Sequence, residues 1–89
     1  MYYTYILYSC KTDHYYIGHT HDLELRLERH NDGWSRSTKS GIPWKIIYYE
    51  EYSTKSDANK RELEIKRKKS RKYIATLIAG GRTNAGRLA

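Results

Sequence analysis

The chain has 89 residues, and its 17 Lys and Arg against 10 Asp and Glu give a net charge of +7 at pH 7. This length allows one small domain, which buries only about 60–65% of the surface that its unfolded chain exposes. No stretch approaches the roughly 20 apolar residues of a membrane span, and the start lacks the features of a signal peptide. We therefore expect a cytoplasmic protein without membrane association, whose positive charge attracts nucleic acid.

Aromatic packing in this chain depends on tyrosine, because there are ten Tyr and no Phe. Each Tyr hydroxyl needs water, a hydrogen-bond partner or a chemical role, so several must lie at a surface or in a cleft. Cys10 is the one cysteine, which excludes an intramolecular disulfide. Because it lies in a strand-like run, we expect Cys10 to pack as a small apolar residue.

The first third of the chain predicts a hairpin. Residues 2–10, rich in Tyr, Thr, Ile and Leu without Gly or Pro, predict a strand. Turn-forming residues follow in the segment CKTDH, and residues 14–20 predict a second strand. Since the connection is short, the two strands are expected to pair.

A helix over residues 22–31 is predicted next. The segment Thr20, His21 and Asp22 offers an N-cap, and Leu, Arg and His then recur at helical spacing in DLELRLERH. The segment HNDG ends the helix, because Asn31 or Gly33 can adopt the left-handed conformation there.

The rest of the chain predicts one more strand and two more helices. Residues 44–52, WKIIYYEEY, predict a strand, and residues 55–69 predict a helix capped by Thr54 with Asp57. A short helix over 71–78 follows. The order ββαβαα predicts an α+β fold with a three-stranded antiparallel sheet flanked by helices.

The domain is expected to span residues 1–79. Residues 80–89, GGRTNAGRLA, show no periodicity and are expected to form a flexible C-terminal tail.

Polar residues at particular spacings indicate a phosphate-handling site. Arg26 and His30 are four residues apart, so they project side by side from the predicted helix. Gly18 ends a strand, where a glycine often marks the close approach of another backbone or a ligand. Glu62 is an acid among cations on the core side of its helix, which suits a metal ligand. Alone, each of these residues is more often structural.

Together, the motifs resemble the GIY-YIG nuclease superfamily. TYI (residues 4–6) and YIG (residues 16–18) resemble its two signature motifs. The first motif reads Tyr3-Thr4-Tyr5 here, so its Gly and Ile are absent while its tyrosine, Tyr5, remains. DLELRLERH resembles the family's arginine helix. SDANKRELEIKRKKSRK resembles the A-x-x-x-E-x-E-I-K helix of its small, single-domain bacterial members. The resemblance covers about residues 2–78 and is specific because the motifs keep their order and spacing.

The resemblance implies a metal-dependent endonuclease. It puts the catalytic groups at Tyr5, Tyr16, Arg26 and His30, and one Mg²⁺ or Mn²⁺ ion at Glu62. Arg26 would hold a phosphate oxygen, and the metal would polarise the phosphate. Tyr5 or Tyr16, with a pKa lowered by Arg26 and other cations, would accept the proton of the attacking water, assisted by His30. No small-molecule cofactor is expected.

The expected partner is DNA or RNA, bound mainly through phosphate contacts. The residues expected to make these contacts are His19, Arg36, Lys39, Lys66, Lys68 and Lys69. With no room for a separate DNA-binding domain, cleavage is expected to be directed by DNA structure, a dimer or a partner protein rather than by sequence.

Two alternatives compete with the nuclease. The first is a nucleic-acid-binding module with the nuclease fold but weak catalysis, which the charge supports equally. The second is a zinc protein using His19, His21 and His30, which is disfavoured because zinc sites prefer four Cys and His ligands.

Overall fold

The structure is a computed structural model that describes residues 1–80 of the chain. Within these residues the elements are β1 (Tyr2–Ser9), β2 (His14–Thr20), α1 (Leu23–Asn31), the 3-10 helix η1 (Lys39–Gly41), β3 (Trp44–Tyr52), α2 (Lys55–Lys68) and α3 (Arg71–Gly80). The predicted ββαβαα order is confirmed, and each predicted boundary lies within two residues of the observed one. The short η1 was not predicted.

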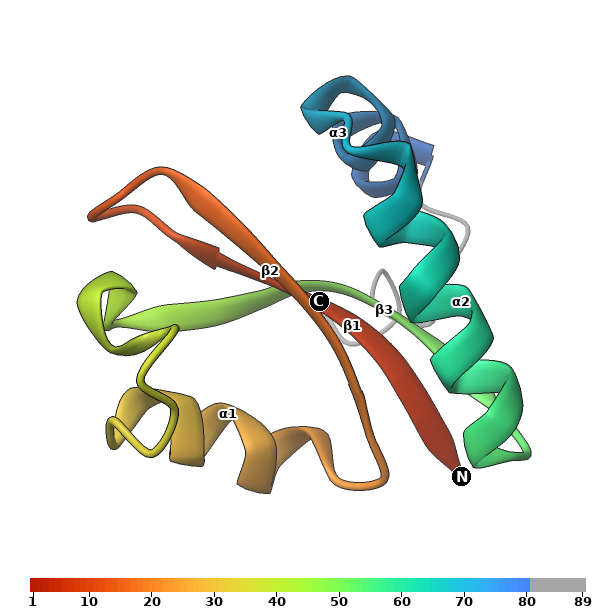
Figure 1. Cartoon of the computed structure of the whole chain (residues 1–89), viewed down its shortest axis with the longest axis horizontal. Helices are drawn as coiled ribbons and strands as arrows, with labels where there is room; N and C mark the ends of the chain where they lie inside the picture. Colours follow the sequence, from red (N-terminus) through yellow and green to blue (C-terminus); the bar gives the residue numbers. More distant parts are fainter. Residues whose placement is uncertain (81–89) are drawn as a thin grey trace.

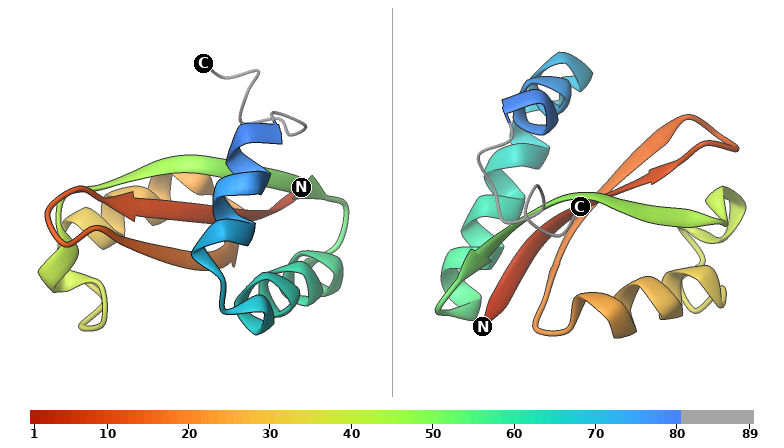
Figure 2. Two further views of the ribbon diagram at one scale, coloured as in Figure 1. Left: turned by 90° about the horizontal axis from the view of Figure 1, so that it is seen from above. Right: turned by 180° about the vertical axis from the view of Figure 1, so that it is seen from behind.

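The three strands form one antiparallel sheet with β1 in the centre, in the order β2–β1–β3. Helix α1 lies on one side of this twisted sheet, and α2 and α3 lie on the other (Figures 1 and 2). The α+β fold is therefore the predicted one. Because β2 is an edge strand, groups from the helices on both faces can meet beside it.

Two hydrophobic cores form, one on each face of the sheet, because side chains alternate along β1. The buried residues on the α1 side are Tyr5, Leu7, Trp44 and Tyr49, and those on the other side are Ile6, Tyr48, Ile65 and Ile74. Leu23 and Leu27 of α1 pack against the first core, as their helical spacing requires. The apolar face of α1 therefore packs that helix against the side of the sheet that carries Tyr5.

The helix ends follow local sequence signals. Of the three candidate N-caps of α1, Asp22 is the one used, and its Oδ1 accepts a hydrogen bond from the Leu25 N–H at 3.0 Å. Thr54 caps α2 by accepting from the Asp57 N–H at 3.2 Å. After α1, Gly33 takes the left-handed conformation with φ +82°.

The structure corrects two details at element ends. Strand β1 ends at Ser9, so Cys10 falls in the turn and is exposed instead of packed. Gly80, which was assigned to the tail, is the last residue of α3. The remaining tail residues, 81–89, lie outside the described residues. Within residues 1–80, no helix has the length and apolar character needed to cross a bilayer.

Candidate active site

Two tyrosines from the hairpin lie on the same face of the sheet. In the β1–β2 register Tyr5 is opposite Gly18, and Leu7 is opposite Tyr16. The centroids of the Tyr5 and Tyr16 rings are 6.4 Å apart. His30, near the end of α1, contacts both rings, with centroid separations of 6.3 Å to Tyr5 and 4.9 Å to Tyr16. The three side chains form one cluster between the sheet and α1.

Gly18 allows the Tyr5 ring to cross β2. A Cβ atom at position 18 would stand 2.5 Å from the Tyr5 hydroxyl oxygen and 2.7 Å from its Cζ. These separations are far below the roughly 3.5–4.0 Å of a favourable nonbonded contact. The close approach expected at this glycine is therefore present, and the approaching group is the Tyr5 side chain.

A chain of hydrogen bonds orients His30. The Tyr5 hydroxyl lies 3.2 Å from His30 Nε2, and His30 Nδ1 lies 2.9 Å from Thr38 Oγ1. Because the Thr38 hydroxyl donates to the Ser35 carbonyl, its oxygen is left to accept from Nδ1–H. A neutral imidazole has one donor and one acceptor nitrogen, so Nε2 accepts from the Tyr5 hydroxyl.

The protonation states of this cluster follow from burial. Burial, and then the positive charge of Arg26, lower the pKa of His30 below its ordinary 6.5, so the ring is neutral at pH 7. Burial raises the pKa of Tyr5 to about 12, although the neighbouring Arg26 guanidinium acts to lower it. The expectation of a lowered pKa is thus wrong for Tyr5, because desolvation of the phenolate outweighs the attraction of the cation.

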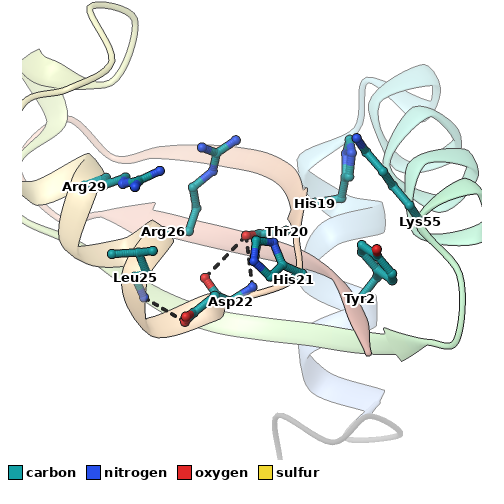
Figure 3. Close-up of a pocket in the computed structure, with 9 residues that line it drawn as sticks. All are labelled: Tyr2, His19, Thr20, His21, Asp22, Leu25, Arg26, Arg29 and Lys55. Carbon is teal, nitrogen blue, oxygen red and sulfur yellow. Dashed lines mark hydrogen bonds between the residues drawn. The ribbon is translucent and has the colours of Figure 1, made fainter.

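A pocket with a volume of about 310 Å³ lies next to this cluster. Figure 3 shows Arg26 and Arg29 projecting from α1 on one side, with His19 of β2 and Lys55 of α2 on the other. Two guanidinium groups and an ammonium group outnumber the carboxylate of Asp22 in the described lining, so the pocket favours an anion such as a phosphate. Since the positive charge of Arg26 also acts to lower the pKa of Tyr5, Arg26 connects the pocket to the tyrosine cluster.

Glu62 lies on α2, across the sheet from α1, and its side chain is only 11% exposed. Its Oε1 accepts a hydrogen bond from His19 Nδ1 and its Oε2 accepts one from Lys66 Nζ, both at 2.5 Å. Burial acts to raise the pKa of Glu62, but the hydrogen bonds from Lys66 and His19 outweigh burial and hold that pKa below its ordinary value. The carboxylate is therefore ionised at pH 7.

The two halves of the site meet at β2. His19 joins them, because it binds Glu62 and also lines the pocket with Arg26. The charge of Arg26 acts to lower the pKa of Tyr5 and the charge of Glu62 acts to raise it. A guanidinium and a carboxylate from opposite faces of the sheet thus act on the same phenol hydroxyl.

The chemistry of Glu62 fits a hard divalent ion. An ionised carboxylate is the type of ligand that Mg²⁺ binds while keeping most of its waters. The Lys66 side chain is 46% exposed on a flexible stem, so a dication could replace its ammonium group at Oε2. Within the described part of the chain, no group of three or more His, Cys, Asp or Glu side chains could hold a metal. An ion here would therefore depend on Glu62 and water.

The histidines of the zinc alternative are not brought together. His30 is buried between Tyr5 and Thr38, whereas His19 binds Glu62 on the other face of the sheet. His21 lies against the Tyr2 ring, with centroids 6.4 Å apart. Across residues 1–80 these side chains provide no shared ligand set.

The residues predicted to bind phosphate lie on both sides of the sheet. Arg36 and Lys39 are exposed in the segment between α1 and β3. Lys68 and Lys69 are exposed at the C-terminal end of α2, and Lys66 pairs with Glu62. The Lys68 ammonium lies 5.3 Å from the centroid of the Tyr73 ring.

Part of the basic run on α2 and α3 has structural partners. The Arg61 guanidinium pairs with Glu50 at 2.8 Å and with Glu64 at 2.5 Å. Arg71 pairs with Asp13 of the hairpin turn at 3.1 Å. The charge of this run therefore overstates the number of cations available to a ligand.

Sequence reasoning missed several residues of the site. Arg29 follows Arg26 by three positions, and this helical spacing could have identified it. Lys55 and Thr38 gave no such signal, because the packing of α2 and the loop before η1 bring them to the site.

Comparisons with known proteins identify the family of this chain. Residues 1–74 match the GIY-YIG catalytic domain. A UPF0213 protein of Staphylococcus saprophyticus is 41% identical over 79 residues, which cover 88% of this chain and 95% of that protein. The UPF0213 protein YazA of Bacillus subtilis is 40% identical over 70 residues, 74% of this chain and 71% of that protein. No solved structure gave a significant match.

The matched region contains the whole sheet, α1 and α2, and with them both halves of the site. The similar proteins also share most of their own length with this chain. The chain therefore belongs to the GIY-YIG nuclease superfamily, together with the small UPF0213 proteins of bacteria.

Proposed function

We propose that this protein is a metal-dependent endonuclease that hydrolyses phosphodiester bonds in DNA. The observation that carries the proposal is the position of the Tyr5 hydroxyl. It hydrogen-bonds His30 and is acted on by the opposite charges of Arg26 and Glu62. Phosphodiester hydrolysis needs such a combination of a cation for the phosphoryl oxygens, a proton acceptor and a metal ligand.

Arg26 is the group proposed to bind the phosphate. Its side chain is exposed, lines the pocket and carries a planar guanidinium that can donate two hydrogen bonds to non-bridging oxygens. A divalent ion held by Glu62 would supply further positive charge for the phosphoryl and leaving oxygens.

Tyr16 is the tyrosine proposed to accept the proton of the attacking water. A general base must reach the water within hydrogen-bond distance. Tyr5 is only 1% exposed and its pKa is raised to about 12, whereas Tyr16 is half-buried. We assign Tyr5 to positioning, since its hydroxyl donates to His30 and holds that ring beside Tyr16.

Selectivity is proposed to come from the shape of the nucleic acid, a dimer or a partner protein. The pocket presents Arg26, Arg29 and Lys55 to an anion, and charge of this kind binds phosphate without reading bases.

One observation favours a second candidate function. Both oxygens of Glu62 already have partners, in His19 and Lys66. If these contacts persist when metal is added, Glu62 is structural and the protein is a nucleic-acid-binding module without efficient catalysis.

The substitution Glu62→Gln tests the proposal, because it preserves side-chain size and removes the negative charge. We expect wild type with Mg²⁺ or Mn²⁺ to cleave at least one member of a panel of linear, supercoiled, branched and single-stranded DNAs. Glu62→Gln should abolish cleavage and retain DNA binding. Arg26→Ala should slow cleavage by about 10²–10³-fold, the usual effect of losing a preorganised donor.

The matched control is Glu64→Gln, which removes a carboxylate from the same helix. Glu64 is 55% exposed and pairs with Arg61, away from His19, so cleavage should be unchanged. Full activity of Glu62→Gln would put the metal elsewhere. Wild type that binds DNA but cleaves none of the panel would support the binding module instead.

A further inference from the structure

Trp34 is the most exposed large apolar residue among residues 1–80, with 72% of its surface accessible. It follows Gly33, which adopts φ +82° just after the end of α1. The backbone N–H of Trp34 donates a hydrogen bond to the Arg29 carbonyl at 3.1 Å. The end of a helix therefore holds this indole at the surface, although burying it would remove a large apolar area from water.

The indole lies beside the proposed phosphate-binding groups. The Arg29 guanidinium carbon is 4.9 Å from the centroid of the Trp34 ring and covers one face of it. A hollow of about 190 Å³ is lined by Arg26, Arg29, His30, Trp34 and Ser35. Arg26 and Arg29 also line the pocket of Figure 3, so the hollow and that pocket share their cationic wall.

A flat aromatic surface next to bound phosphate suits an unpaired nucleobase. Bases stack on exposed aromatic side chains, and arginine adds a favourable cation–π interaction. In the interior of a duplex each base is stacked between two neighbours, so a paired base there has no free face to offer. Among residues 1–80, no acidic side chain lines the hollow. The polar residue Ser35 also lines it, which disfavours a large apolar protein interface.

We propose that Trp34 and Arg29 form a stacking platform for an unpaired base close to the phosphate that Arg26 binds. This inference rests on the proposed function and deepens it. The preferred substrate class is nucleic acid with a single-stranded segment at the cleavage site, such as a flap, a branch or a single strand. Uninterrupted duplex is a poorer ligand because it cannot use the platform.

Tryptophan fluorescence tests the inference directly, because the chain has two Trp with different surroundings. Trp34 is exposed and Trp44 is 7% exposed in the core. Without divalent ions, so that no cleavage occurs, oligothymidylate should quench the emission of Trp34. A blunt duplex with the same number of phosphates should not. Trp34→Phe should remove the quenched emission while keeping an aromatic face and near-normal affinity.

Affinity provides the second measurement. Trp34→Ala should weaken binding of oligothymidylate by about 10-fold, within the range for a base stacked on an aromatic residue. Its affinity for blunt duplex should stay at the wild-type value. Leu63→Ala is the control, because Leu63 is an exposed apolar residue of α2, 44% exposed and outside the hollow. Both affinities of that variant should match wild type.

Several outcomes would overturn the platform without touching the nuclease proposal. These are unchanged Trp34 emission on saturation with oligothymidylate, equal quenching by duplex, or wild-type affinity of Trp34→Ala, each with metal-dependent cleavage intact. If wild type neither binds nor cleaves any nucleic acid, the proposed function fails as well.

Discussion

At position 18 a glycine is required by a neighbouring side chain and not by its own backbone angles. The Tyr5 ring occupies the space where a Cβ would stand, at 2.5 Å from its hydroxyl oxygen. The glycine of the second motif therefore leaves room for the tyrosine of the first motif. This space lets the Tyr5 ring pass over β2, so that its hydroxyl can hydrogen-bond His30.

Gly18→Ala should displace the Tyr5 ring. We expect it to destabilise the protein by about 1–3 kcal/mol, as overpacking does in a filled core, and to reduce cleavage by disturbing His30. Chemical denaturation and cleavage rates measure the two effects. In a Tyr5→Leu background the same substitution should cost much less stability, because the ring is gone. Equal costs in both backgrounds would contradict the role given to Gly18.

At the scale of elements, one hydrogen-bond chain ties β1 to α1 and to the loop before η1. Tyr5 donates to His30, and His30 donates to Thr38, which is buried with 1% exposure. The chain requires a neutral imidazole, because a protonated Nε2 could not accept from Tyr5. The packing of three elements therefore depends on the charge of one ring.

The pH dependence of stability should reveal this requirement. Since the pKa of His30 is lower in the folded protein than its ordinary 6.5, the unfolded chain binds a proton first as pH falls. The free energy of unfolding should therefore decrease as pH drops from about 7 to about 5. His30→Gln should be less stable at pH 7 and should lack this part of the decrease.

Denaturation at a series of pH values measures this effect. Glu50 and Glu62, whose pKa values are lowered from 4.5, also make stability fall as the solution becomes more acidic. Because His30→Gln keeps both carboxylates, the difference between its profile and that of wild type isolates the histidine. Identical pH profiles for wild type and His30→Gln would mean that the ring is not held neutral by its surroundings.

At the scale of the whole molecule, the net charge of +7 is only partly available to a ligand. Arg61 and Arg71 are paired with carboxylates, whereas Arg26, Arg29 and Lys55 converge on the pocket from two helices on opposite sides of the sheet. The total charge of the protein determines its long-range attraction for nucleic acid. The position at which a phosphate binds is expected to depend on the convergence of these three side chains.

Binding of duplex DNA should weaken steeply with salt. The logarithm of the affinity should fall linearly with the logarithm of salt concentration, by about 0.9 per phosphate neutralised. Lys55→Ala should reduce the slope by about one unit if Lys55 contacts a phosphate. Lys11→Ala removes an exposed charge from the hairpin turn and should leave the slope nearly unchanged. Equal slopes for wild type and Lys55→Ala would exclude Lys55 from the binding surface.

The sequence by itself determined the order and extent of the elements in residues 1–80. Strand alternation, the Asp22 and Thr54 caps and the turn at Gly33 depend on groups only a few residues apart, so local sequence carries that information. The order and spacing of Tyr5, Tyr16, Arg26 and Glu62 were enough to indicate the family.

Only the tertiary structure decided the contacts and the pKa values of those residues. The Glu62–His19 contact joins positions 43 residues apart, and Lys55 reaches the pocket through the packing of α2. The pKa of Tyr5 shows why these contacts and pKa values could not be predicted. The charge of Arg26 alone would lower that pKa, but burial raises it by more. Desolvation depends on everything that packs around a group, and that is set by segments remote from it in the chain.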